Sequence, residues 1–231
     1  MPTNQLSVEQ KAEVDETTKA VADKLLLYKF RPLAGLERLA DILLNERLYC
    51  AKYYELNDPF EGICIVMGKF GTPEDPGQRY NCSTSVDDLL APEDFIDVRV
   101  CSLAGSFDDI RLWSHYGGSH KGVAIEIDLI DAENAPFKVN YIGGLKRYDQ
   151  TLGKNPSVKD ILSHKTTHWE YENEYRILAN SSYYDIRGRI NRVLLGARCN
   201  QHDEQLIRRL VPKEVEVVRT KLNQSDTKVE V

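Results

Sequence analysis

Closely spaced acidic residues ahead of an apolar segment are the most unusual chemical feature of this sequence. Glu170, Glu172 and Glu174 alternate along the chain, and Arg176 follows. This spacing is typical of one polar face of a strand, so the charges need cationic partners or raised pKa values. Glu174 and Glu172 are therefore candidate catalytic carboxylates. Ion pairing with Arg176 that merely stabilises the fold is the alternative.

A second group of residues suits an anionic ligand. Tyr28, Lys29 and Arg31 end the first apolar segment of the domain, just before a predicted helix. Cations beside the amide groups of a helix N-terminus create a positive potential. A strand end whose long side chains simply reach solvent would show the same pattern.

Two further stretches place polar groups in turns or glycine-rich loops. In the segment 56–62, Asn57 and Asp58 precede a proline, a pattern that predicts a turn. The polar side chains of this turn either hydrogen-bond the turn's own backbone or face a ligand. In the segment 112–122, Tyr116 and His120 lie among glycines that let the backbone approach a ligand. Trp113 in the same loop is expected in the core.

Metal and disulfide chemistry are not favoured. His164 and His168 are spaced for one helix face, but Lys165 stands where a zinc protease has glutamate, so we predict surface histidines and no metal site. The five cysteines are scattered, which argues against a disulfide framework and a cysteine zinc site. Cys64 and Cys101 lie in apolar runs and are predicted to be small core residues.

Composition indicates a cytoplasmic α+β protein. The 231 residues are 42% hydrophobic and 29% charged, and no apolar run approaches the ~20 residues of a membrane span. The start of the chain lacks the apolar stretch of a secretory signal. The net charge of −6 does not support binding of nucleic acid through overall charge. A local basic groove formed by the arginines at 187–198 remains an alternative.

Apolar periodicity predicts the elements that must position these residues. Helices are expected at 7–24, 36–44, 109–116, 158–169 and 202–210. Strands are expected at 25–30, 48–51, 98–103, 123–129 (half-exposed), 137–142, 175–179, 193–197 and 215–222.

The order of these elements predicts small mixed or antiparallel sheets with flanking helices rather than a doubly wound fold. We expect an N-terminal helix at 1–24, a single domain at 25–222 and a flexible tail at 223–231. The segment 71–97 is rich in proline and acidic residues, which predicts a long loop or a lid-like insertion.

Five motifs occur in an order that resembles the bacterial domain-of-unknown-function family 2971, from about Leu25 to Leu222. The motifs are Tyr28-Lys29-Phe30-Arg31, Asn57-Asp58-Pro59-Phe60-Glu61, Cys101-Ser102-Leu103, Trp113-Ser114-His115-Tyr116 with His120-Lys121-Gly122, and Lys165, Trp169, Glu172, Glu174-Tyr175-Arg176.

The plan of a strand with a polar end, a helix and a later strand beginning with glutamate is more distantly similar to ADP-ribosyltransferases of the DarT type. The similarity implies an ADP-ribosyltransferase-like fold in which Lys29 or Arg31 contacts NAD and Glu174 supports attack on the ribose carbon. That family usually has histidine or arginine where this chain has Tyr28 and Lys29.

The resemblance implies an NAD-dependent enzyme that needs no metal and acts in bacterial defence against phage or in a stress response. Lys29 and Arg31 would hold the pyrophosphate, Tyr28 or Tyr116 would stack on nicotinamide, and Glu174 would stabilise the developing positive charge. Asn57, Asp58 and His120 would line the pocket or select the acceptor, which could be nucleic acid, protein or a small molecule. Alternatives are a non-enzymatic ligand or protein sensor, and a metal-independent hydrolase that uses His115 or His120.

The polar density of these motifs predicts that they converge on one concave site or one buried ion network. The converging residues would be Tyr28, Arg31, Asn57, Glu61, Trp113, His120, Lys165, Glu172, Glu174 and Arg176. Within this set, the planar fork of Arg176 is expected to bind Glu61 or Glu172.

Overall fold

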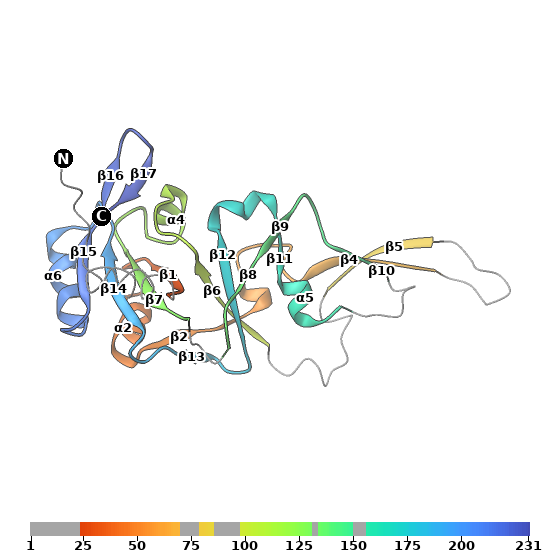
Figure 1. Ribbon diagram of the computed structural model, residues 1–231, viewed down its shortest axis with the longest axis horizontal. Helices are drawn as coiled ribbons and strands as arrows, with labels where there is room; N and C mark the ends of the chain where they lie inside the picture. Colours follow the sequence, from red (N-terminus) through yellow and green to blue (C-terminus); the bar gives the residue numbers. More distant parts are fainter. Residues whose placement is uncertain (1–23, 70–78, 86–97, 131–133, 150–155) are drawn as a thin grey trace, which may run out of the picture.

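A mixed sheet of eight described strands is the centre of this α+β protein, seen in the computed structural model of Figure 1. The structure describes residues 24–69, 79–85, 98–130, 134–149 and 156–231. Along the sheet the order is β15 (Glu216–Arg219), β14 (Ile190–Leu195), β7 (Val123–Asp128), β1 (Leu26–Arg31), β6 (Arg99–Ala104), β12 (Glu174–Ala179) and β8 (Phe137–Lys138), and β3 (Ala51–Lys52) also pairs with β6. Neighbours are antiparallel except β14 and β15, so the predicted fold class is confirmed.

The sheet opens between β1 and β6. Their described register contains a single pair, Tyr28 with Ala104, whereas β1 pairs with β7, and β6 with β12, along six residues. Lys29 bridges the opening, because its Nζ donates to the Ser102 carbonyl oxygen at 2.7 Å. The sheet is therefore nearly divided into two halves, β15-β14-β7-β1 and β6-β12-β8 with β3.

Apolar residues on both faces of the sheet make the core. Helices α2 (Leu36–Asn45) and α6 (Gln201–Leu210) pack Leu39, Leu43 and Ile207 against one face. Helix α4 (Ile110–His115) packs Leu112 and Trp113 against the other. The strands obey the alternation of side chains across a sheet, and the predicted core position of Trp113 is confirmed.

Small sheets extend the fold on the side of β12 and β8 (Figure 1). One contains β10 (Arg147–Asp149), β4 (Ile63–Lys69) and β5 (Arg79–Ser85), and another pairs β9 (Asn140–Ile142) with β11 (His164–Thr166). Elsewhere β2 (Arg47–Tyr49) pairs with β13 (Tyr183–Asp185), and β16 (Lys221–Asn223) with β17 (Lys228–Glu230). Short helices are η1 (Tyr53–Glu55), α5 (Val158–Leu162) and η4 (Thr167–Glu172).

The half-exposed strand predicted at 123–129 is wrong. Strand β7 is central, and Glu126 has no exposed surface. Its carboxylate accepts hydrogen bonds from the Tyr28 hydroxyl at 2.7 Å and from Arg192 at 2.9–3.0 Å. A carboxylate can be buried when hydrogen-bond donors satisfy both of its oxygens. Glu126 therefore did not mark a solvent-exposed face of the strand.

Two other boundaries also differ from expectation. The helix predicted at 158–169 ends at Leu162, and β11 and η4 follow it, so His164 and His168 do not share a helix face. The flexible tail predicted at 223–231 is wrong for residues 228–230, because they form β17 and Val229 is buried.

Some expectations fall on segments outside the described residues. The helix at 7–24 does so, apart from its last residue. Within the predicted long loop 71–97, residues 79–85 form β5 and pair with β4, so this part is strand, and the remainder is outside the described chain. Among the residues described, no helix is long and apolar enough to cross a membrane.

Candidate functional site

A pocket of about 460 Å³ lies at the opening between β1 and β6. It brings together most of the residues singled out in the sequence. Those that line it are Tyr28, Lys29, Arg31, Asn57, Tyr116, Lys165, Glu172, Glu174 and Arg176. The strand opening explains the convergence, because β1 supplies one wall and β6 with β12 supplies the opposite wall.

Three cations mark one end of the pocket. The Lys29 ammonium binds the Ser102 carbonyl oxygen, and burial lowers its pKa. Burial also lowers the pKa of Arg31, whose Nε has no hydrogen-bond partner among the described residues. Arg38 on α2 is exposed and lies near Arg31. This end can therefore accept an anionic group without first breaking a described ion pair.

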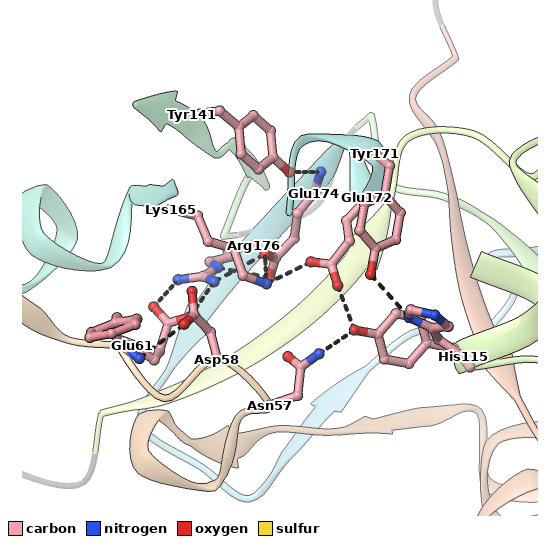
Figure 2. Close-up of polar contacts among 12 residues, drawn as sticks. Asn57, Asp58, Glu61, His115, Tyr141, Lys165, Tyr171, Glu172, Glu174 and Arg176 are labelled. Atoms are coloured by element: carbon pink, nitrogen blue, oxygen red, sulfur yellow. Dashed lines mark hydrogen bonds and ion pairs between the residues drawn. The ribbon is translucent and has the colours of Figure 1, made fainter. Parts of the chain in front are cut away.

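The other end of the pocket is a buried network of ionic groups, shown in Figure 2. Glu174 has 3% of its surface exposed, and its two oxygens bind Arg176 Nε at 2.8 Å and Lys165 Nζ at 3.2 Å. Burial alone would raise the pKa of Glu174, but Arg176 and Lys165 lower it to about 2. Glu174 is therefore a fixed negative charge at neutral pH.

Glu172 completes this network on the side of α4. Its Oε2 accepts from Lys165 Nζ at 2.6 Å, and its Oε1 accepts from the Tyr116 hydroxyl at 2.5 Å. The Asn57 amide donates in turn to the Tyr116 oxygen. Asn57 and Tyr116 thus connect the turn after η1 to the end of α4 beside the pocket.

Glu61 anchors the network from behind the pocket. Arg176 binds both oxygens of Glu61 at 2.6 and 2.7 Å, and it also donates to the Leu162 carbonyl oxygen. Of the two partners predicted for Arg176, Glu61 is confirmed, whereas Glu172 binds Lys165 instead. Desolvation by burial raises the pKa of Glu61, although Arg176 opposes it.

No protein-family model, no curated protein and no solved structure matches this chain. The two family resemblances therefore rest on motifs and on the order of elements.

The predicted strand face of three glutamates is wrong. Glu170 is exposed and Glu172 is buried, both in helix η4, and Glu174 begins β12. Asn173 between them has a left-handed backbone with φ of 43°. This turn lets Glu172 and Glu174 both reach Lys165, which supplies the cationic partner that like charges require.

Two proposed pocket residues do not line the pocket. Asp58 is buried in its turn, where Oδ1 accepts the Phe60 N–H at 2.9 Å, and it borders a separate small cavity. His120 packs on Trp113 with ring centroids 6.3 Å apart. Burial lowers the pKa of His120, so this ring is a neutral packing group. Glu61 and Trp113 likewise lie behind the lining.

Two residues of the site carry no sequence signal that could have revealed them. Arg38 lies on the exposed side of an ordinary amphipathic helix. The Tyr141 hydroxyl accepts the Glu174 N–H at 2.8 Å and fixes the start of β12 (Figure 2). Among the described residues there is no group of three or more His, Cys, Asp or Glu side chains placed to hold a metal.

Proposed function

We propose that this protein is an ADP-ribosyltransferase-like enzyme that uses NAD as a substrate. The observation that carries the proposal is the division of one pocket into a cationic end and a carboxylate end, at an opening of the sheet. NAD has the matching division, since two phosphates lie on one side of the ribose that bears the positively charged nicotinamide.

The cationic end suits the pyrophosphate. Arg31 and Arg38 have no carboxylate partner among the described side chains, so a phosphate would replace water rather than an internal ion pair. Lys29 is held between the two halves of the sheet by Ser102 and offers a further hydrogen-bond donor. The ligand phosphates would thus meet pre-positioned cations.

The carboxylate end suits the reacting ribose. When the bond between ribose C1′ and the nicotinamide nitrogen breaks, nicotinamide leaves with the bonding electrons and positive charge develops on the ribose. Glu174 and Glu172 are negative charges already fixed by Lys165 and Arg176, so they stabilise that charge without reorganising. The acceptor then forms the new bond to C1′ and releases its proton to solvent.

Aromatic rings at the pocket offer stacking faces. Tyr116 lies at the carboxylate end, with its hydroxyl bound by Glu172, and is therefore suited to nicotinamide. Tyr28 is held by Glu126 through its hydroxyl and lies near Ala104, where the two halves of the sheet meet. Asn57 at the rim would contact the ligand or the acceptor.

One observation favours a second function, a sensor that binds the same ligand without turnover. Every oxygen of Glu172 and Glu174 is already bound by a cation or by Tyr116. A carboxylate whose oxygens all have partners can serve structure alone. The two functions share the binding step and differ in nicotinamide release.

The test is incubation of the purified protein with NAD labelled in the adenylate, with and without cell lysate. The enzyme releases nicotinamide and transfers label, and Glu174→Gln should lower the rate by ~100-fold or more because a pre-organised charge is lost. Glu170→Gln, an exposed neighbour, is the matched control and should keep full activity. Binding of NAD without nicotinamide release would support the sensor, and no binding would reject both functions.

A further inference from the structure

Two cysteines face each other behind the cationic end of the pocket. The register pairs Ala51 with Val100 and Lys52 with Arg99, so Cys50 is the next residue and lies opposite Cys101. Both are free thiols with no exposed surface, and each shifts the pKa of the other. Opposed residues of antiparallel strands have Cα atoms ~4.5–5.5 Å apart, which is within the range that a disulfide spans.

The surroundings favour a thiolate at Cys101. The hydrogen bond from Cys50 lowers the pKa of Cys101, and Lys29 and Arg31 act in the same direction, although burial opposes them. The pKa of Cys50 is raised, first by its hydrogen bond to Cys101 and then by burial. One sulfur is therefore suited to be the nucleophile and the other to be the thiol that resolves the intermediate.

We propose that Cys50 and Cys101 form a reversible disulfide that regulates binding of an anionic ligand in the adjacent pocket. A peroxide oxidises the Cys101 thiolate to a sulfenic acid and is itself reduced to hydroxide or an alcohol. The Cys50 thiol then attacks the sulfenic sulfur, a disulfide forms, and water leaves with the Cys50 proton. A dithiol reductant reverses the change.

The chain segments that carry the two cysteines also line the pocket, which links the pair to the ligand. Ala51, Val100 and Ser102, the chain neighbours of the two cysteines, line the pocket. In the reduced protein the thiolate offsets the charge of Lys29 and Arg31, the same groups that we assign to phosphate. The disulfide is neutral, so oxidation leaves Arg31 uncompensated and should strengthen binding of an anion.

Two other buried cysteines, which lack a cysteine neighbour in the described chain, show why the pair is distinct. Cys64 and Cys199 are also buried, but burial raises the pKa of each, and neither has a cysteine in contact among the described residues. They are therefore internal controls that should not react under the same conditions.

The first measurement is peroxide treatment of the full chain, followed by alkylation in denaturant and mass spectrometry of peptides. We expect loss of two alkylated thiols and a linked peptide that contains Cys50 and Cys101, reversed by dithiothreitol. Cys64→Ser should give the same linked peptide. Retention of free Cys50 and Cys101 while other thiols oxidise would overturn the proposal.

The second measurement is calorimetric binding of ADP-ribose, and this half of the inference rests on the proposed function. The oxidised protein should bind about tenfold more tightly than the reduced protein. Cys101→Ser removes the thiolate charge, so it should bind like the oxidised wild type and ignore peroxide. A disulfide that forms without any change in affinity overturns the regulatory role, whereas absence of binding in both states overturns the assigned ligand and leaves the disulfide standing.

Discussion

Arg176 and Glu61 face each other as a buried pair joined by two hydrogen bonds, Nη1 to Oε1 at 2.6 Å and Nη2 to Oε2 at 2.7 Å. The residues are 115 positions apart, and neither side chain has more than 2% of its surface exposed. The pair connects the turn after η1 to strand β12 of the main sheet, so it holds one wall of the pocket in place. It also determines how the site should respond to mutation and to acid.

Arg176→Ala should reduce the free energy of unfolding by about 3 kcal/mol, because it leaves Glu61 and Glu174 buried with an uncompensated charge. Urea titration monitored by circular dichroism measures this. Arg187→Ala removes an arginine that pairs with Asp185 on the surface and is the matched control, expected to leave stability unchanged. Equal stability of Arg176→Ala and wild type would show that the network does not support the fold.

Acid should destabilise the protein through Glu174. Its pKa is about 2 in the folded state, below the ordinary value of 4.5, so its contribution is fully present above about pH 5 and is lost as pH falls toward 2. The pKa difference corresponds to about 3 kcal/mol. Unfolding free energies measured between pH 6 and 2 should fall less steeply for Glu174→Gln than for wild type.

A surface carboxylate, Glu204, provides the comparison for this pH experiment. The pKa of Glu204 is also lowered, by hydrogen bonds from Arg219 and Arg208, but its partners are solvent-exposed. Because water screens such pairs, Glu204→Gln should change the acid slope far less than Glu174→Gln. Identical slopes for wild type and Glu174→Gln would contradict the assigned pKa.

Arg38→Ala should weaken binding of NAD about tenfold, since a hydrogen bond to a charged group contributes ~1.5–3 kcal/mol. Isothermal titration calorimetry at low and high salt measures the effect, and the loss should shrink as salt screens the charge. Arg209→Ala, an exposed arginine on α6 outside the pocket, is the control. Equal losses for both variants would point to a general charge effect rather than a phosphate site.

Val229→Ala should reduce the free energy of unfolding by about 1–2 kcal/mol, because Val229 is 2% exposed and packs against the cluster around Trp113. Thermal and chemical denaturation both report this change. Val231→Ala, two positions later and 49% exposed, should be neutral. If both substitutions are neutral, β17 does not contribute to the stability of the domain.

The sequence by itself was sufficient wherever local patterning decides the outcome. The apolar spacing at 36–44 predicted α2, the apolar run at 25–30 predicted β1, and the size of Trp113 predicted the core. That Arg176 binds a carboxylate also followed from residue type, because a buried arginine needs a partner that can accept two hydrogen bonds. The choice of Glu61 over Glu172 was made by the tertiary structure. Whether Glu174 acts on NAD stays a prediction.

Tertiary structure decided what these patterns leave open. The sequence pattern of 123–129 shows that its side chains alternate between two faces of a strand. It does not show that β1 and β14 flank β7 and bury Glu126. Arg192, the partner of Glu126, is 66 positions away. The opening of the sheet is likewise a matter of register between strands β1 and β6, which lie far apart in the chain. Residues separated in this way meet through pairing and packing of whole elements, so no local pattern encodes the pocket that they form.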